Sequence, residues 1–168
     1  NQMLKPAKPK VLAIASAGGH WEQLRRLRPA WENCTVTYVT TSVNRKKEVQ
    51  DESLGSGIKL PGFFVIVEAS RWQKLKLLLQ LLQIAKIIII SKPDVIISTG
   101  AAPGFFALFL GQLFGARTIW LDSIANVDEM SLSGKIVRKY ADLWLTQWEH
   151  LTTNDDDGKS PQFEGKVV

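Results

Sequence analysis

The stretch Lys10-Val-Leu-Ala-Ile-Ala-Ser16-Ala-Gly18-Gly19-His20-Trp-Glu-Gln-Leu24 decides the fold of this chain. A short apolar run ends at Ser16, two glycines follow, and Leu24 opens a stripe with helical spacing. An apolar run of this length is typical of a strand that is buried on both faces. The sequence therefore predicts a strand, a tight turn and a helix in close succession.

The composition of the turn between this strand and this helix is typical of a turn that binds an anion. Gly18 and Gly19 remove two Cβ atoms where the backbone turns, so N–H groups at the helix start can approach an anion. Glycine is also common at such turns for helix–sheet packing alone, and that alternative stays open. The fingerprints G-x-G-x-x-G and G-x-x-x-x-G-K-[ST] are absent, which argues against NAD and P-loop nucleotides.

The composition indicates one soluble domain with a real core, since 45% of the 168 residues are hydrophobic and 22% are charged. The single cysteine, Cys34, has no internal disulfide partner. Its place at the start of a β-like run predicts a buried thiol in a reducing compartment. No signal peptide is recognisable in the first residues, which hold lysines and prolines without a following apolar region.

The charge is divided unevenly along the chain. Residues 1–92 carry 15 basic and 6 acidic side chains, a net +9, while residues 93–168 carry 6 and 10, a net −4. This asymmetry predicts two faces with different partners. No RNP, zinc-finger or basic-zipper pattern supports nucleic acid as a partner. An anionic membrane surface or a diphosphate substrate accounts for the basic half equally well.

Strand-like and helix-like patterns alternate along the rest of the chain. Further strands are expected at 34–40, 63–68, 94–98, 118–121 and 141–146; helices at 72–90, at 103–115 and from about Ser133; and a mobile loop at 41–62. This alternation predicts an α/β fold, a Rossmann-like parallel sheet with helices on both faces. We expect residues 1–9 to form a flexible N-terminal segment, residues 10–151 the domain, and residues 152–168 a solvated tail.

Ligands of such sheets bind outside the carboxyl ends of the strands. This rule brings together four segments at one edge: residues 16–20, 99–104, 122–126 and 146–150. Two of them are glycine-bearing turns at helix starts, an arrangement that can hold a diphosphate through backbone N–H groups. No cluster of His, Asp and Glu has metal-ligand spacing, so no metal is expected.

The helix at 72–90 is apolar over far more of its circumference than packing on a sheet needs. Gln73, Lys76, Gln80 and Gln83 form a narrow polar stripe, with Lys86 near it. Two interpretations remain open, a core helix between sheet and neighbours or a monotopic membrane contact. The second predicts membrane contact by Arg71, Trp72, Lys74, Leu75, Lys76, Leu78, Leu79 and Leu82. The lysines and glutamines argue against a membrane span.

Three motifs together resemble a known family: Ser16-Ala-Gly-Gly-His20, Ser98-Thr-Gly-Ala-Ala-Pro-Gly104 and Trp120-Leu-Asp-Ser-Ile-Ala-Asn126. The chain resembles the membrane-associated subunit of split GT-B glycosyltransferases. This family includes the N-terminal-half subunit of the eukaryotic dolichol-diphosphate N-acetylglucosamine transferase and bacterial exopolysaccharide glucuronosyltransferase subunits. The resemblance runs from about Val11 to Leu151, and the tail beyond matches nothing in it.

The resemblance implies a division of labour between two chains. This chain would be the acceptor-side half of an inverting, UDP-sugar-dependent enzyme of polysaccharide biosynthesis, inactive without its partner. It would recruit the partner to the cytoplasmic face of the membrane and bind a polyprenyl-diphosphate-linked sugar. The partner would hold most of the donor, UDP-glucuronate or UDP-N-acetylglucosamine, and no tightly bound cofactor is implied. The tail would help to hold the partner.

Within that scheme, His20 is the candidate general base, because an imidazole titrates near neutral pH. Asp122 is the second catalytic candidate, orienting the acceptor or His20; each also has a structural alternative, as a turn residue and a helix cap. The candidate acceptor and diphosphate contacts are Ser16, Gly18, Gly19, Thr99, Gly100, Gly104, Ser123 and Asn126. Glu149 and His150 are second-rank candidates.

Two rival functions remain open. The chain could be a membrane scaffold that positions a catalytic partner and supplies no chemistry. It could also be a small hydrolase using Ser123, His20 and Asp122, although the G-x-S-x-G elbow of such enzymes is absent.

Overall fold

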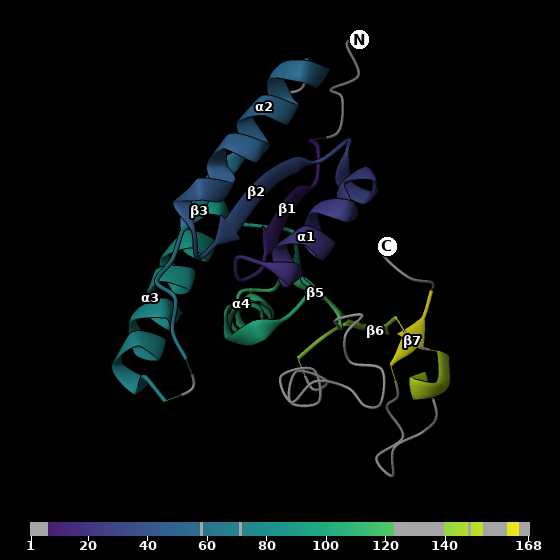
Figure 1. Cartoon of the computed structure of the whole chain (residues 1–168). Coiled ribbons are helices and arrows are strands. Elements are labelled where there is room, and N and C mark those ends of the chain that lie inside the picture. The colour runs from purple at the N-terminus through teal and green to yellow at the C-terminus, as the bar shows by residue number, and fades with distance from the viewer. Residues whose placement is uncertain are drawn as a thin grey trace.

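The computed structural model describes residues 7–57, 59–70, 72–122, 140–147, 149–152 and 161–164. Within these residues seven strands form one parallel sheet in the order β3-β2-β1-β4-β5-β6-β7 (Figure 1). The strands are β1 Lys10–Ile14, β2 Thr35–Thr40, β3 Gly62–Val65, β4 Val95–Ser98, β5 Arg117–Leu121, β6 Leu143–Thr146 and β7 Gln162–Phe163. The α-helices are α1 Gly19–Arg26, α2 Lys46–Ser56, α3 Lys74–Ser91 and α4 Ala101–Leu113. The predicted Rossmann-like sheet is therefore confirmed.

The first strand lies near the middle of the sheet, as its apolar sequence requires. β1 pairs with β2 on one side and β4 on the other, with Ile14 opposite both Val39 and Ser98. Four of its five residues are buried, and only Lys10 at its start is exposed. A strand covered on both faces has no polar side, which explains the unbroken apolar run.

Two separate apolar cores lie on the two faces of the sheet. Leu12 and Ile14 of β1 point to a core shared with α3 and α4, which contains Ile84 and Leu108. Alternate residues of the same strand, such as Ala13, point to a second core shared with α1 and α2. The period of two along a strand produces this division, since neighbouring side chains leave the sheet on opposite faces.

The predicted mobile loop at 41–62 is wrong. The segment contains a short 3-10 turn at Val43–Arg45 and then the eleven-residue helix α2, which ends at Gly57 in a left-handed conformation. Only Val49 and Ser53 of this helix are buried. With so few buried positions there is no apolar stripe, and hydrophobic periodicity gives no signal for the helix.

Two further expectations can be compared with the structure. Cys34 is half-buried rather than buried, because it precedes β2 in a turn where its N–H donates to the carbonyl of Trp31. The strand at 141–146 is confirmed as β6. The short strand β7, which pairs Gln162 with Leu145, was not predicted. The expected helix from about Ser133 lies outside the described residues.

Candidate functional site

Two glycine-bearing turns meet at the carboxyl edge of the sheet, as the strand order predicts. One follows β1 and leads into α1, and the other follows β4 and leads into α4. They are joined by two hydrogen bonds: Nδ1 of His20 lies 3.1 Å from the carbonyl oxygen of Thr99, and the Thr99 hydroxyl donates to the carbonyl oxygen of His20 at 2.5 Å. Segments separated by 79 residues therefore form one unit around His20.

This contact fixes which nitrogen of His20 is available for chemistry. A carbonyl oxygen only accepts hydrogen bonds, so Nδ1 of His20 must carry the proton that it donates to Thr99. In the neutral ring the lone pair then resides on Nε2. The side chain of His20 is half-buried.

The second turn has no room for a side chain where it passes His20. A Cβ atom at Gly100 would lie 2.4 Å from Nδ1 of His20, and the residue has a φ of +148° that L side chains rarely adopt. Ser98, the last residue of β4, also holds this turn, because its hydroxyl accepts a hydrogen bond from the N–H of Gly100 at 3.3 Å. A Cβ at Gly104 would lie 2.1 Å from the same Ser98 Oγ. Packing against His20 and Ser98 is therefore a sufficient reason for glycine at positions 100 and 104.

The first turn is different, because open space surrounds it. A Cβ at Gly18 or Gly19 would meet nothing within 4 Å. Neither α1 nor α4 receives a side-chain hydrogen bond at its N-cap. The first N–H groups of a helix need an outside partner, and an anion is the partner that the helix dipole favours. Behind the turn, Thr41 accepts from the N–H of Ala17 at 3.0 Å and anchors the half-buried Ser16 segment.

Asp122 follows β5 at the same edge, but its carboxylate is turned inward. The residue is 1% exposed, and its Oδ1 accepts from Nε1 of Trp120 at 3.1 Å. Through this hydrogen bond the Asp122 carboxylate stabilises the end of β5. The other predicted residues of this segment, Ser123 and Asn126, lie outside the described residues. The structure does not describe the side chains of Glu149 and His150 either.

A buried pair of glutamines behind the site was not predicted. Nε2 of Gln147 donates to Oε1 of Gln23 at 2.8 Å and to the carbonyl oxygen of Asp122 at 2.9 Å. Gln147 is fully buried after β6, and Gln23 lies three residues beyond His20 on α1. The pair ties α1 to the ends of β5 and β6. No local pattern reveals it, because the two residues are 124 positions apart.

A charged cluster joins α1 to α2 beside the site. Glu48 accepts from Nε1 of Trp21 at 3.0 Å and from Arg45 at 2.7 Å. Burial by itself raises the pKa of Glu48, but these two hydrogen bonds and the charges of Arg45 and Arg25 outweigh it, so the pKa lies below its usual value. The hydrogen bond to Glu48 likewise raises the pKa of Arg45.

The same cluster is anchored to the core through Arg25. Its guanidinium pairs with Glu52 of α2 and lies over the ring of Tyr38, 4.8 Å from the ring centroid. These contacts explain why α2 forms without an apolar stripe, since its inner face is held by charge and hydrogen bonds as well as by Val49.

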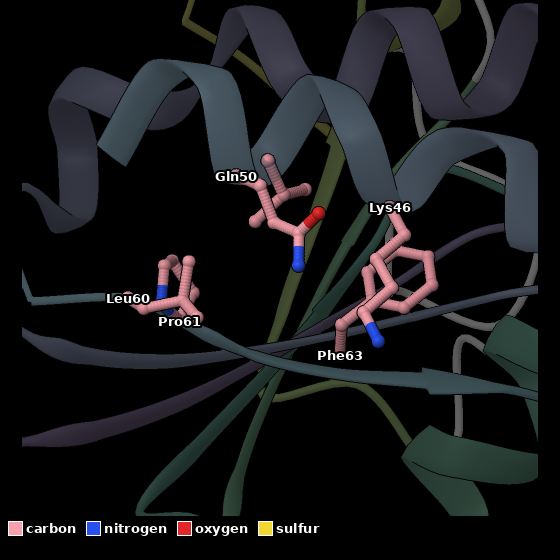
Figure 2. Close-up of a pocket in the computed structure, with 6 residues that line it drawn as sticks. Lys46, Gln50, Leu60, Pro61 and Phe63 are labelled. Atoms are coloured by element: carbon pink, nitrogen blue, oxygen red, sulfur yellow. The ribbon is translucent and has the colours of Figure 1, made fainter. Parts of the chain in front are cut away.

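The cavity shown in Figure 2 does not coincide with this site. It has a volume of about 220 Å³ and lies between α2 and the strand β3, next to Lys46, Gln50 and Phe63. β3 is the edge strand at one end of the sheet and lies two strands away from β1. The glycine turns contribute no residue to this cavity.

The predicted membrane residues lie on α3 or just before it. The described members are all exposed: Trp72, Lys74, Leu75, Lys76, Leu78, Leu79 and Leu82. Arg71 lies outside the described residues. Among the helices that the structure describes, none combines the length and the apolar character needed to cross a membrane. The described residues also contain no group of three or more His, Cys, Asp or Glu side chains arranged to hold a metal ion.

The sheet order, the helices on both faces and the paired glycine turns define a Rossmann-like half-domain of the GT-B type. Among solved structures the chain is similar to MurG from Acinetobacter baumannii, with a TM-score of 0.68 and 12% identity over 88% of this chain and 44% of that one. It is also similar to a UDP-N-acetylglucosamine 2-epimerase from Listeria monocytogenes, with a TM-score of 0.60 and 17% identity over 84% of this chain and 39% of that one. The chain thus spans less than half the length of these structures.

Sequence comparison identifies the family. Residues 11–160 match the model for "Oligosaccharide biosynthesis protein Alg14 like", and the chain belongs to this family. Its relatives include proteins named UDP-N-acetylglucosamine transferase subunit ALG14. The Debaryomyces hansenii protein is 25% identical, over 84% of this chain and 70% of the relative. The Yarrowia lipolytica protein is 26% identical, over 88% and 77%. The resemblance inferred from the three motifs is therefore confirmed.

Proposed function

We propose that this chain is the acceptor-side subunit of a two-component inverting glycosyltransferase of polysaccharide biosynthesis. It binds a sugar linked to a polyprenyl diphosphate, and a separate partner subunit holds most of the donor, UDP-N-acetylglucosamine or UDP-glucuronate. The relatives support this division, because they are named as transferase subunits. The activity requires both chains.

The observation that carries the proposal is the reciprocal contact between His20 and Thr99. The contact directs the protonated Nδ1 into the protein, so the lone pair on Nε2 is available to an acceptor hydroxyl. In the proposed reaction Nε2 accepts the proton of that hydroxyl while the hydroxyl oxygen bonds to the anomeric carbon of the donor. The bond from that carbon to UDP breaks, and the diphosphate leaves with the electron pair.

The acceptor diphosphate binds at the open first turn in this proposal. The uncapped start of α1 and the space around Gly18 and Gly19 support this, since backbone N–H groups at a helix start complement phosphate charge. Ser16, Thr99, Gly100 and Gly104 shape the same edge, and Ser123 and Asn126 complete the proposed set. Asp122 acts as a brace that keeps β5 in place.

The reaction takes place at the cytoplasmic face of the membrane, where a UDP-sugar meets a polyprenyl-linked acceptor. The chain is peripheral or monotopic there and recruits the partner. The basic first half of the sequence supports this placement, because anionic lipid attracts such a surface.

Reconstitution tests the proposal. Transfer from each UDP-sugar to a polyprenyl-diphosphate-linked sugar is measured with this chain, with a candidate partner encoded beside it, and with both, in the presence of anionic lipid. Product formation only with both chains is the expected result. Turnover by this chain alone would overturn the split arrangement and place the whole donor site within these 168 residues.

A further inference from the structure

β3 is an edge strand, and part of its outer edge is open. Among the residues that the structure describes, β3 pairs with β2 alone. The N–H of Ile66 donates to the carbonyl oxygen of Thr40 at 2.9 Å, so residues 62, 64 and 66 direct their backbone groups towards β2. Successive residues of a strand direct these groups to opposite sides. The N–H and C=O groups of Phe63 and Val65 therefore point away from the sheet.

The same edge is closed two residues further along the chain. There, the backbone groups of Val67 are paired with side chains of α3. Nε2 of Gln80 donates to the Val67 carbonyl oxygen at 2.8 Å, and Oε1 of Gln83 accepts from the Val67 N–H at 2.8 Å. No described residue makes such a contact with Phe63 or Val65. The open part of the edge is therefore short and offers the backbone groups of these two residues.

The cavity of Figure 2 lies beside this open edge. Its volume is about 220 Å³, and its lining comes from both α2 and the chain that enters β3: Lys46, Val49, Gln50, Leu60, Pro61 and Phe63. A strand added to β3 would continue the sheet, and every second side chain of that strand would lie on the face that α2 covers. The cavity is therefore placed to receive such a side chain.

Two polar side chains of α2 line the cavity, and neither has a hydrogen-bond or ion-pair partner in the described part of the chain. They are Lys46 and Gln50, which lie one helical turn apart on the same flank of α2. In Figure 2 both extend from α2 towards β3, and Lys46 lies beside Phe63. An ammonium group and an amide N–H both donate hydrogen bonds, so together they complement a carboxylate.

The glutamates of α2 do not balance the charge of Lys46. Glu48 pairs with Arg45, and Glu52 pairs with Arg25. These two glutamates lie one turn apart on the flank of α2 that faces α1. Lys46 therefore keeps an unpaired positive charge beside the open edge, and this charge favours an acidic ligand.

We propose that the open edge of β3 binds an extended acidic peptide segment of a partner protein by strand addition. The N–H and C=O groups of Phe63 and Val65 pair with the backbone of the peptide. An acidic side chain of the peptide contacts Lys46 and Gln50. An apolar side chain two residues away fills the cavity between Leu60 and Phe63.

This surface is distinct from the contact expected with the transferase partner. The family resemblance places that contact in the tail, and β7, the described strand of the tail, lies at the opposite end of the sheet from β3. The glycine turns contribute no residue to the cavity. Peptide binding at β3 therefore goes beyond the proposed function, and either proposal can fail without the other.

Fluorescence anisotropy of the intact chain with the labelled peptide Thr-Val-Thr-Glu-Thr-Val-Thr tests the acidic contact. The peptide reads the same in both directions, so its glutamate and valines share one face in parallel or antiparallel pairing. Lys46→Glu should weaken binding roughly tenfold or more, because attraction becomes repulsion. The matched control is Lys86→Glu, which changes an exposed lysine of α3 and should bind as the parent does. Equal binding by Lys46→Glu and the parent would overturn the acidic contact.

Amide hydrogen exchange tests the open edge itself. In the free chain the N–H groups of Phe63 and Val65 should exchange quickly, whereas that of Phe64, which faces β2, should be protected. The peptide should protect Phe63 and Val65 and leave Phe64 unchanged. Protection of Phe63 and Val65 in the free chain, or no change with the peptide bound, would overturn strand addition.

Two changes block backbone pairing and leave the side chains of the cavity in place. Val65→Pro removes an outward N–H, and proline is tolerated on the free side of an edge strand. A fully N-methylated peptide loses the same hydrogen bonds without any change to the protein. Each should bind roughly tenfold more weakly. Undiminished binding of the N-methylated peptide, or no binding of the unmodified one, would overturn the proposal; the reconstituted transfer assay judges the proposed function separately.

Discussion

Gln147 and Gln23 form a hydrogen bond of 2.8 Å inside the protein although 124 residues separate them. The bond joins the end of β6 to the helix that carries His20, and Gln147 also donates to the backbone of Asp122. The position of His20, the candidate base, therefore depends on the Gln23–Gln147 hydrogen bond as well as on its own contact with Thr99.

Replacing Gln147 by Leu should destabilise the chain by about 2 kcal/mol, because two buried acceptors lose their donor. Urea unfolding measures this change. The matched control is Gln112→Leu, which alters an exposed glutamine on α4 and should stay within about 0.5 kcal/mol of the parent. Equal stability of the two variants would contradict a structural role for the glutamine pair.

Replacing Gly100 by Ala should cost about 2 kcal/mol or more, because the new Cβ meets the ring of His20 and the backbone is strained at its φ of +148°. Thermal unfolding measures the loss, and the ¹⁵N shifts of the His20 ring report whether the bond from Nδ1 to Thr99 survives. Gly55→Ala is the control, since a Cβ there meets nothing and α2 should gain roughly 0.5–1 kcal/mol. A stable Gly100→Ala variant with the bond intact would refute this packing.

Replacing His20 by Gln should lower kcat/KM of the reconstituted enzyme roughly 100-fold or more if Nε2 accepts the proton of the acceptor. The unfolding midpoint and the binding of the partner chain should change little, which separates chemistry from assembly. Nearly unchanged turnover would favour the scaffold, in which this chain only positions its partner.

The stability of the chain should fall as the pH drops below about 4.3, the ordinary pKa of a glutamate in an unfolded chain. The folded pKa of Glu48 is lowered, so its stabilising contribution is present above the unfolded value and is lost as the pH falls through the folded one. Glu48→Gln should flatten this part of the curve of stability against pH. The effect should be modest, because the side chain of Glu48 is 43% exposed. Asp51→Asn, on the same helix, is the charge control; a profile unchanged by Glu48→Gln would exclude this linkage.

The sequence by itself determined the architecture and the place of the site. Buried parallel strands have unbroken apolar runs, and glycine turns mark where strands become helices. The strands β1 to β6 and the edge that gathers His20, Thr99 and Gly100 therefore follow from local pattern. The helix at 72–90 was also visible, although its composition left its environment open between core and membrane.

Only the tertiary structure decided which side chains meet. The helix α2 escaped prediction because ion pairs with α1 hold it, and such contacts leave no period in the sequence. Distance along the chain hid the Gln23–Gln147 bond, which joins residues 124 positions apart. The inward turn of Asp122 onto Trp120, only two residues away, leaves no period in the sequence either. The inward position of Gln80 and Gln83 on α3 depended on Val67, whose backbone groups need partners from outside its own segment. Local pattern records which residues a strand or helix buries, whereas the identity of their partners is fixed only when the elements pack.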